Sequence, residues 1–65
     1  MSKFRTISDI LTTDESGNLL HIVELAGPSD ETKPTTGLAN GSIFLETDTG
    51  KISLYDEDDG WGTAQ

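Results

Sequence analysis

The run Asp48-Thr49-Gly50 is the first place in this sequence where residue types and spacing could do chemistry. An aspartate in such a run can form half of an acid protease, in which two chains each supply one carboxylate and the pair shares a proton in a buried, apolar setting. Here polar residues precede the run and Lys51 follows it. Aspartate and glycine are also residues that tight turns favour. We therefore predict a hairpin turn at Asp48, Thr49 and Gly50, with a homodimeric acid protease using Asp48 as an alternative.

A second acidic group, Asp56, Asp58 and Asp59, carries the oxygen ligands that calcium prefers and is followed by Gly60. In an EF-hand loop the glycine stands at the sixth place, whereas Gly60 is the fifth residue counted from Asp56. This spacing predicts a solvated acidic turn. Weak calcium binding by the three aspartates is left open.

The other candidate residues are isolated. His21 is the single histidine and has no serine or cysteine at a spacing that indicates a catalytic triad, so we expect it to pack in a strand. Gly50-Lys51 ends like a phosphate-binding loop, but Ile52 stands where serine or threonine is required. Tyr55 and Trp61 could stack on a base, and we expect them instead in a core or an interface.

Composition narrows the function classes further. The chain has 65 residues, twelve Asp and Glu against four Lys and Arg, a formal charge of −8 and no cysteine. This charge argues against binding to a phosphate backbone, and the lack of cysteine excludes disulfides and thiol chemistry. The longest aliphatic or aromatic run, Ile43-Phe44-Leu45, is too short for a membrane span, and no apolar stretch of a secretion signal follows Lys3 and Arg5. We predict no catalytic residue, no metal site, no cofactor and no nucleic-acid or membrane partner, and hence that the protein is not an enzyme.

The elements that must position these residues form one small domain in three parts. Residues 1–27 are an N-terminal segment and strand region, in which Asp14–Asn18 reads as a turn and Leu19–Leu25 alternates as a strand. Residues 1–13 combine a short helical stripe with β-branched threonines, and we favour extended structure there. Residues 28–41 are a linker of Pro, Gly and polar residues that should run over a surface or follow a partner.

The third part, residues 42–65, is predicted to be a C-terminal β-hairpin. A three-residue loop with a bulge at Gly50 would place Phe44 opposite Leu54, so that Phe44, Ile52 and Leu54 share one face. The other face would be apolar as well, and a hairpin with one face in water should alternate cleanly. The second face is therefore expected to meet another subunit. The residues predicted to form this oligomer interface are Ile43, Phe44, Leu45, Ile52, Leu54, Tyr55 and Trp61.

The length of the chain points the same way. Below ~70–80 residues a single core rarely supplies more than ~3–5 kcal/mol unless a disulfide, a metal or oligomerisation adds to it. With no cysteine and no predicted metal site, oligomerisation remains. The predicted fold is therefore all-β, a small two-hairpin domain with an extended linker that is completed by oligomerisation.

The run from Asn40 to Glu57, followed by Trp61, resembles a pattern in small virion-associated proteins of tailed bacteriophages, G-S-x-F-x-E-x-D-T-G-K-x-Y-x-Y/F-D before a turn and a tryptophan. The stretches Thr-Asp-Glu-Ser-Gly-Asn, His-Ile-Val-Glu-Leu-Ala-Gly and Lys-Pro-Thr-Thr-Gly are similar too, so the resemblance covers roughly residues 12–61. Ser53 departs from the pattern, which favours an aromatic residue there, and this removes a large side chain from the predicted face of Ile43. The residues at the fixed places are Phe44, Glu46, Asp48, Gly50, Lys51, Tyr55 and Trp61.

The resemblance implies a head-fibre, head-decoration or tail-associated component, small, β-rich and commonly trimeric. We expect a non-enzymatic bacteriophage virion structural protein, a capsid decoration or fibre-base subunit. It would form a homotrimer, dock on a phage capsid or tail protein, and lie in the virion after assembly in the host cytoplasm. Besides the acid protease using Asp48, an acidic regulatory or inhibitor protein stays open, because residues 28–65 carry eight acids against two lysines.

Overall fold

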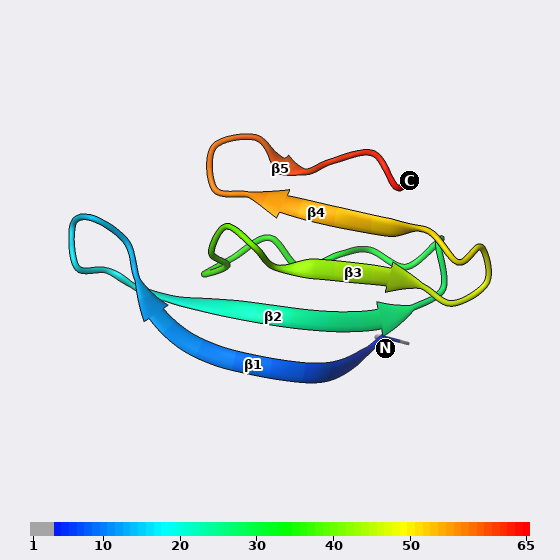
Figure 1. Cartoon of the computed structure of the whole chain (residues 1–65), viewed down its shortest axis with the longest axis horizontal. Coiled ribbons are helices and arrows are strands. Elements are labelled where there is room, and N and C mark those ends of the chain that lie inside the picture. The colour runs from blue at the N-terminus through cyan, green and yellow to red at the C-terminus, as the bar shows by residue number, and fades with distance from the viewer. Residues whose placement is uncertain (1–3) are drawn as a thin grey trace.

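The computed structural model describes residues 4–65 and shows a single five-stranded sheet (Figure 1). Strand order follows the chain, and neighbouring strands pair antiparallel except β2 and β3, which are parallel. The predicted all-β class with two hairpin-like units is confirmed, whereas its completion by oligomerisation stays a prediction. The strands are β1 (Arg5–Thr13), β2 (Leu19–Gly27), β3 (Ile43–Glu46), β4 (Ile52–Asp56) and β5 (Gly60–Trp61).

Strand β1 resolves the ambiguous N-terminal segment in favour of extended structure. It pairs along its length with β2, from Arg5 opposite Ala26 to Thr13 opposite Leu19, with one irregularity between Thr6 and Ser8. The helical stripe of apolar residues does not form a helix, because a helix of two turns is only marginally stable. Pairing with β2 instead gives the backbone of a nine-residue strand its hydrogen-bond partners.

The turn between β1 and β2 is held by one carboxylate. Asp14 Oδ1 accepts hydrogen bonds from the backbone N–H groups of Ser16 and Asn18, each at 2.9 Å. These bonds, that of Asn18 first, lower the pKa of the Asp14 carboxyl. Gly17 takes the positive φ of 84° that the turn requires. The predicted turn at Asp14–Asn18 is confirmed.

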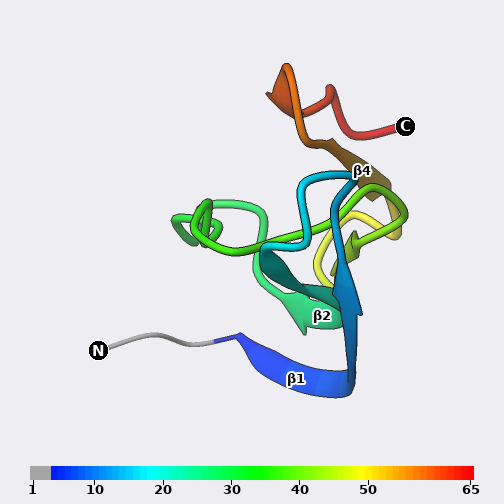
Figure 2. The same cartoon turned by 90° about the vertical axis from the view of Figure 1, so that its left-hand side faces the viewer.

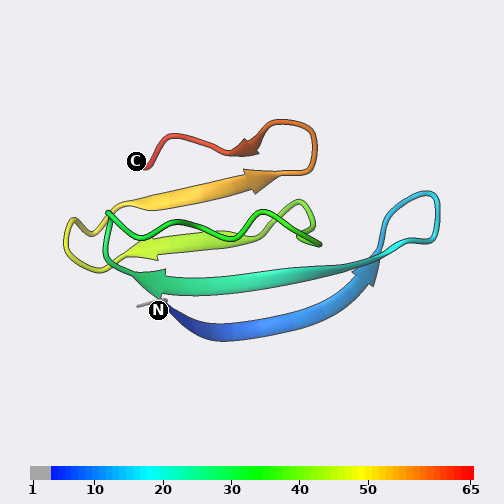
Figure 3. The ribbon, with the colours of Figure 1, turned by 180° about the vertical axis from the view of Figure 1, so that it is seen from behind.

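The predicted linker is the crossover that parallel pairing of β2 and β3 demands. It lies on one side of the strands (Figure 2) and, seen from behind, runs across β3 (Figure 3). Leu38 and Ala39 are buried, and Leu38 forms a bridge with His21. Ser42 Oγ, itself buried, accepts a hydrogen bond from Val23 N–H (3.1 Å) and donates one to Ala39 O (2.9 Å). The segment thus runs over a surface, as expected, and that surface is one face of its own sheet, here named the covered face.

The core lies between the covered face and this crossover. It consists of Val23, Leu25, Leu38 and Phe44, and Phe44 is 0% exposed. Three aromatic side chains pack around it edge to face: Phe4 and Trp61 lie 6.1 and 6.2 Å from Phe44 between ring centroids, and Tyr55 lies 5.1 Å from Trp61. Trp61 Nε1 also donates a hydrogen bond of 2.7 Å to Pro34 O, which fixes the crossover over the core.

The register predicted for the β3–β4 hairpin is wrong by one residue. Phe44 lies opposite Ser53, not Leu54, because the turn contains four residues, 47–50, rather than three. Glu46 N–H donates to Lys51 O and Gly50 N–H donates to Glu46 O, both at 2.8 Å. A slip of one residue moves every side chain of the return strand to the other face of the sheet.

This shift changes where the small residue of β4 lies. Ser53 is 1% exposed on the covered face, opposite Phe44, and not on the face of Ile43 as expected. Its size suits that place, because aromatic rings and the crossover already occupy the space above it. Ile52 and Leu54, predicted to lie with Phe44, instead point to the opposite side of the sheet.

Candidate functional site

The opposite side of the sheet, here named the open face, is the most distinctive surface of residues 4–65. Alternation and pairing put side chains from four strands on it: Ile10 lies opposite Ile22, Ile43 opposite Leu54, and Leu45 opposite Ile52. Leu54 is 63% exposed, Ile10 59% and Ile52 42%, and the other members are half-buried. The other exposed large aliphatic residues, Ile7, Leu11 and Leu19, do not belong to this group. Exposed apolar side chains gathered on one face are typical of interaction sites. We define the open face by Ile10, Ile22, Ile43, Leu45, Ile52 and Leu54.

The predicted oligomer interface is divided between the two faces. Phe44 is wholly inside the core, and Tyr55 and Trp61 are half-buried against it on the covered face. Tyr55 Oη additionally donates a hydrogen bond to Thr35 O at 3.2 Å. The four aliphatic members of the predicted set lie together on the open face: Ile43, Leu45, Ile52 and Leu54.

Sequence reasoning missed Ile10 and Ile22 as members of this surface. Ile10 and Ile22 lie on the two strands that the Asp14–Asn18 turn joins. Pairing these strands in register from the turn would have placed the two residues opposite each other. What sequence alone could not supply was the parallel pairing of β2 with β3, which joins the two hairpins into one apolar surface.

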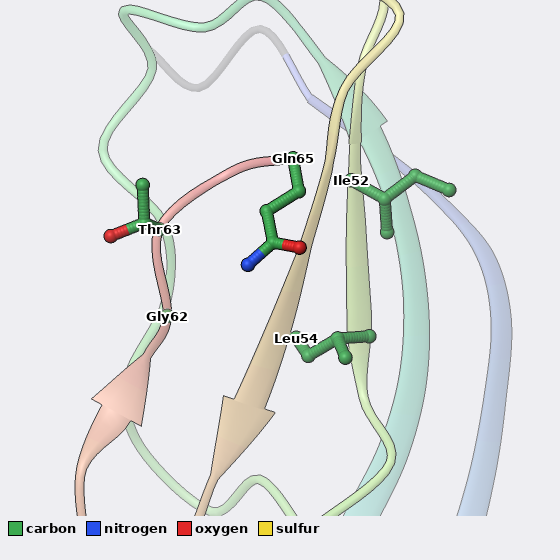
Figure 4. Close-up of a pocket in the computed structure, with 5 residues that line it drawn as sticks. All are labelled: Ile52, Leu54, Gly62, Thr63 and Gln65. Carbon is green, nitrogen blue, oxygen red and sulfur yellow. The ribbon is translucent and has the colours of Figure 1, made fainter.

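A groove of about 340 Å³ extends the open face at its β4 side. Ile52 and Leu54 point to the same side of β4, and Gly62, Thr63 and Gln65, from the segment beside β4, complete the lining (Figure 4). Hydrogen bonds keep this segment beside β4, with Gly62 N–H donating to Leu54 O (2.9 Å) and Ile52 N–H to Gln65 O (3.0 Å). The groove gives an otherwise flat surface a place for a protruding side chain.

Charge is sparse on the open face. Glu24, exposed and opposite both Ser8 and Ile43, is the charged residue in its middle. Arg5 stands at the start of β1 and Asp56 at the end of β4, so both lie at the margins. Most of the other acids lie in turns and in the crossover, away from the strands' apolar side chains.

Asp48 has a structural role in the turn where a protease carboxylate was the alternative. Its Oδ1 accepts a hydrogen bond from Ser29 N–H (2.9 Å) and its Oδ2 one from Ser29 Oγ (2.7 Å). The bond from the Ser29 hydroxyl is the main reason that the pKa of this exposed carboxyl is lowered. An acid protease needs a buried carboxylate that holds a shared proton, and this setting favours the charged form instead. Asp48, Thr49 and Gly50 lie in the turn, as predicted.

Two further polar contacts lie on the covered face. His21 Nδ1 is 2.7 Å from Asp9 Oδ1, with both side chains about half exposed. Glu46, 6% exposed, accepts a hydrogen bond from Thr49 Oγ1 (2.8 Å) and lies 3.7 Å from Lys33 Nζ, which also stands over the Phe44 ring. These contacts tie the crossover and the turn to the sheet.

Two acidic turns, the one between β1 and β2 and the one between β4 and β5, lie close together. Glu57 Oε2 accepts a hydrogen bond from Asn40 N–H, and a polar hollow there is lined by Asp14, Glu15 and Asp58 as well. Asp56 Oδ1 accepts a hydrogen bond from Asp58 N–H (2.8 Å), which is turn geometry. Within residues 4–65 no group of three or more candidate metal ligands is placed to hold an ion.

Comparison of the chain with protein-family models, with curated proteins and with solved structures found no significant match. None of the elements formed by residues 4–65 is a helix with the length and apolar character of a membrane span. The candidate site therefore stands on its own geometry: a one-layer sheet with its core on one side and an apolar surface on the other.

Proposed function

We propose that this protein is a non-enzymatic structural subunit of a bacteriophage particle, a capsid decoration or fibre-base component that self-associates and docks on a capsid or tail protein. The observation that carries the proposal is the open face, since a protein that functions within an assembly can expose an apolar surface that its neighbours cover. The resemblance of residues 12–61 to small virion-associated proteins supplies the kind of assembly.

The distribution of charge supports a role in a large particle. The turns and crossover carry most of the twelve acids and lie around the sheet, so they would face outward once the open face is covered. A negative outer surface keeps assembled particles soluble and mutually repulsive. With three copies, the number that the resemblance implies, each open face would be turned toward the centre of the assembly.

Two measurements test this function. Sedimentation equilibrium of the purified chain should give a mass above that of one copy at micromolar concentration, and three copies would agree with the expected trimer. Imaging of purified phage particles that carry an epitope-labelled copy should place the label on the capsid or the tail. A label absent from intact particles would contradict the virion role, whatever the mass in solution.

A peptidase assay addresses the enzymatic alternative directly. The wild type and the Asp48→Asn variant should show the same absence of peptide cleavage from pH 3 to pH 7, the range in which a carboxylate pair shares a proton. Cleavage by the wild type that the variant loses would replace the structural role with the acid protease.

A further inference from the structure

We infer that the open face is the surface through which copies of this chain bind one another, sheet against sheet, with the crossovers turned outward. This deepens the proposed function, on which it rests, by naming the residues that do the assembling. It also differs from the interface expected from sequence, because Phe44, Tyr55 and Trp61 take no part and Ile10 and Ile22 join it.

The dimensions of the open face suit a second copy. The molecule extends 37 × 21 Å along its two longer axes (Figure 1), so a rectangle of about 780 Å² bounds its broad side with the turns included, and an interface of standard size, ~800 Å² on each partner, would take up nearly all of that side. Sheets pack face to face at a spacing of ~10 Å, so the open face can meet the open faces of neighbouring copies. The groove beside Leu54 can receive an aliphatic side chain that protrudes from the facing copy.

Charge selects this surface for contact between identical chains. Two copies at −8 each repel, and the repulsion is strongest where turns meet turns. On the open face the strands oppose aliphatic side chains, with Glu24 as the one charge in the middle. A partner of opposite charge would gain more from the acidic turns, whereas a copy of the same chain is best accommodated here.

The test compares three lysine substitutions by sedimentation velocity over a range of concentrations. Leu54→Lys and Ile10→Lys each put a charge on the open face, from β4 and β1, and should raise the dissociation constant about tenfold or more. The matched control is Leu19→Lys: Leu19 is 69% exposed but lies on the register of the covered face, so this change should leave the dissociation constant within about twofold. Since all three side chains are exposed, each variant should keep the wild-type circular dichroism spectrum.

A fourth variant changes the sign of the effect. Glu24→Gln removes the charge from the middle of the open face and should lower the dissociation constant several-fold, because a carboxylate no longer has to be desolvated on contact. Its circular dichroism spectrum should match that of the wild type, which distinguishes tighter association of folded copies from aggregation of unfolded chains.

The outcomes separate this inference from the proposed function. Weaker association in the two open-face variants, unchanged association in the control and tighter association in Glu24→Gln support it. If the wild type associates and Leu19→Lys weakens it while Leu54→Lys and Ile10→Lys do not, the inference is wrong and the self-associating subunit still stands. A wild type that stays monomeric at every concentration overturns both.

Discussion

The carboxylate of Asp48 joins the β3–β4 turn to the residues that follow β2. Because its pKa is lowered in the folded chain, the ionised carboxylate stabilises the fold at pH values above the unfolded pKa near 3.9, and this stabilisation is lost as pH falls through the folded pKa. The Asp48→Asn variant should therefore melt at a lower temperature than the wild type at pH 7. The difference should shrink as pH falls below about 3.9 and disappear once pH lies below the folded pKa of Asp48, where the wild-type carboxylate is protonated too.

Thermal unfolding by circular dichroism over this pH range checks the prediction. Asp30→Asn is the matched control, since Asp30 is an exposed aspartate one residue after Ser29. A difference for Asp48→Asn that persists unchanged at the lowest pH would mean that the two bonds to Ser29 contribute nothing to stability.

Trp61 acts at the same scale, as a single side chain that closes the core. It contacts Phe44 and Tyr55 and donates its indole N–H to Pro34 O. Trp61→Ala should lower the free energy of unfolding by about 2–4 kcal/mol, somewhat less than for a fully buried tryptophan because Trp61 is partly exposed. Trp61→Phe keeps a ring but loses the hydrogen bond, and should lower the free energy of unfolding by about 1 kcal/mol relative to the wild type.

Urea unfolding monitored by far-ultraviolet circular dichroism measures both losses. The sequence places Trp61 in the predicted oligomer interface, where Trp61→Ala would weaken assembly. The position of Trp61 on the covered face predicts instead that the change acts within one subunit. Equal stability of Trp61→Ala and the wild type would show that the aromatic group does not hold the crossover in place.

At the scale of the element, the hairpins show how far sequence reasoning reaches. Local chemistry predicts the strand at Leu19–Leu25, which continues to Gly27 in the structure, from alternation, and the turn at Asp48-Thr49-Gly50 from its turn residues. The register does not, because three-residue and four-residue turns both end well on Gly50 and only the packing around Phe44 distinguishes them. In the observed register Ser53 is buried opposite Phe44, whereas Leu54 is 63% exposed on the other face.

The β3–β4 turn itself depends on the backbone of Gly50. Its φ of +75° is in the left-handed region, which β-branched residues avoid. Gly50→Val should destabilise the protein by about 1–3 kcal/mol. Gly50→Asn is the matched control and should cost clearly less, because asparagine tolerates this conformation. Denaturant unfolding of both variants measures the difference, and equal losses would place the cause elsewhere than in φ.

The end of β2 needs glycine for a different reason. A Cβ atom on Gly27 would lie 2.8 Å from the Cβ and 2.9 Å from the Cα of Phe4, so β1 would have to move. Gly27→Ala should cost about 1–3 kcal/mol as an overpacked core site does. Gly62→Ala, where the added Cβ would meet its neighbour at an ordinary 3.5 Å, should be nearly neutral. Melting curves of the two variants give the comparison, and a neutral Gly27→Ala would mean that Phe4 is not held against β2.

At the scale of the whole molecule, the chain has a four-residue core under one face and an apolar surface on the other. Any association that requires the folded state stabilises that state by mass action. The melting temperature of the wild type should therefore rise with protein concentration, while that of Leu54→Lys should change little. Calorimetry over a hundredfold range of concentration would show this, and a concentration-independent wild type would speak against association.

The whole-molecule arrangement was also the hardest part to predict. The linker offers one aliphatic side chain of size, Leu38, and its composition predicted only that it runs over a surface or follows a partner, not which surface. What makes it a second layer are contacts far apart in sequence: Pro34 with Trp61, Lys33 with Glu46 and Leu38 with His21. No local sequence pattern predicts these contacts. They place the crossover on one side of the sheet, and the other side is left as the open face.

The parallel pairing of β2 with β3, here called the seam, also affects the order in which the sheet folds. Each hairpin on either side of it is closed by a short turn, whereas the seam requires the ends of the long crossover to meet, which costs more chain entropy and makes for slow folding. Synthesis from the N-terminus makes β1 and β2 available well before their parallel neighbour. Until β3 has been synthesised, β2 offers an unpaired edge to other nascent chains. The strand that lies between β1 and β3 in the folded sheet is therefore the one most exposed to wrong pairing during synthesis.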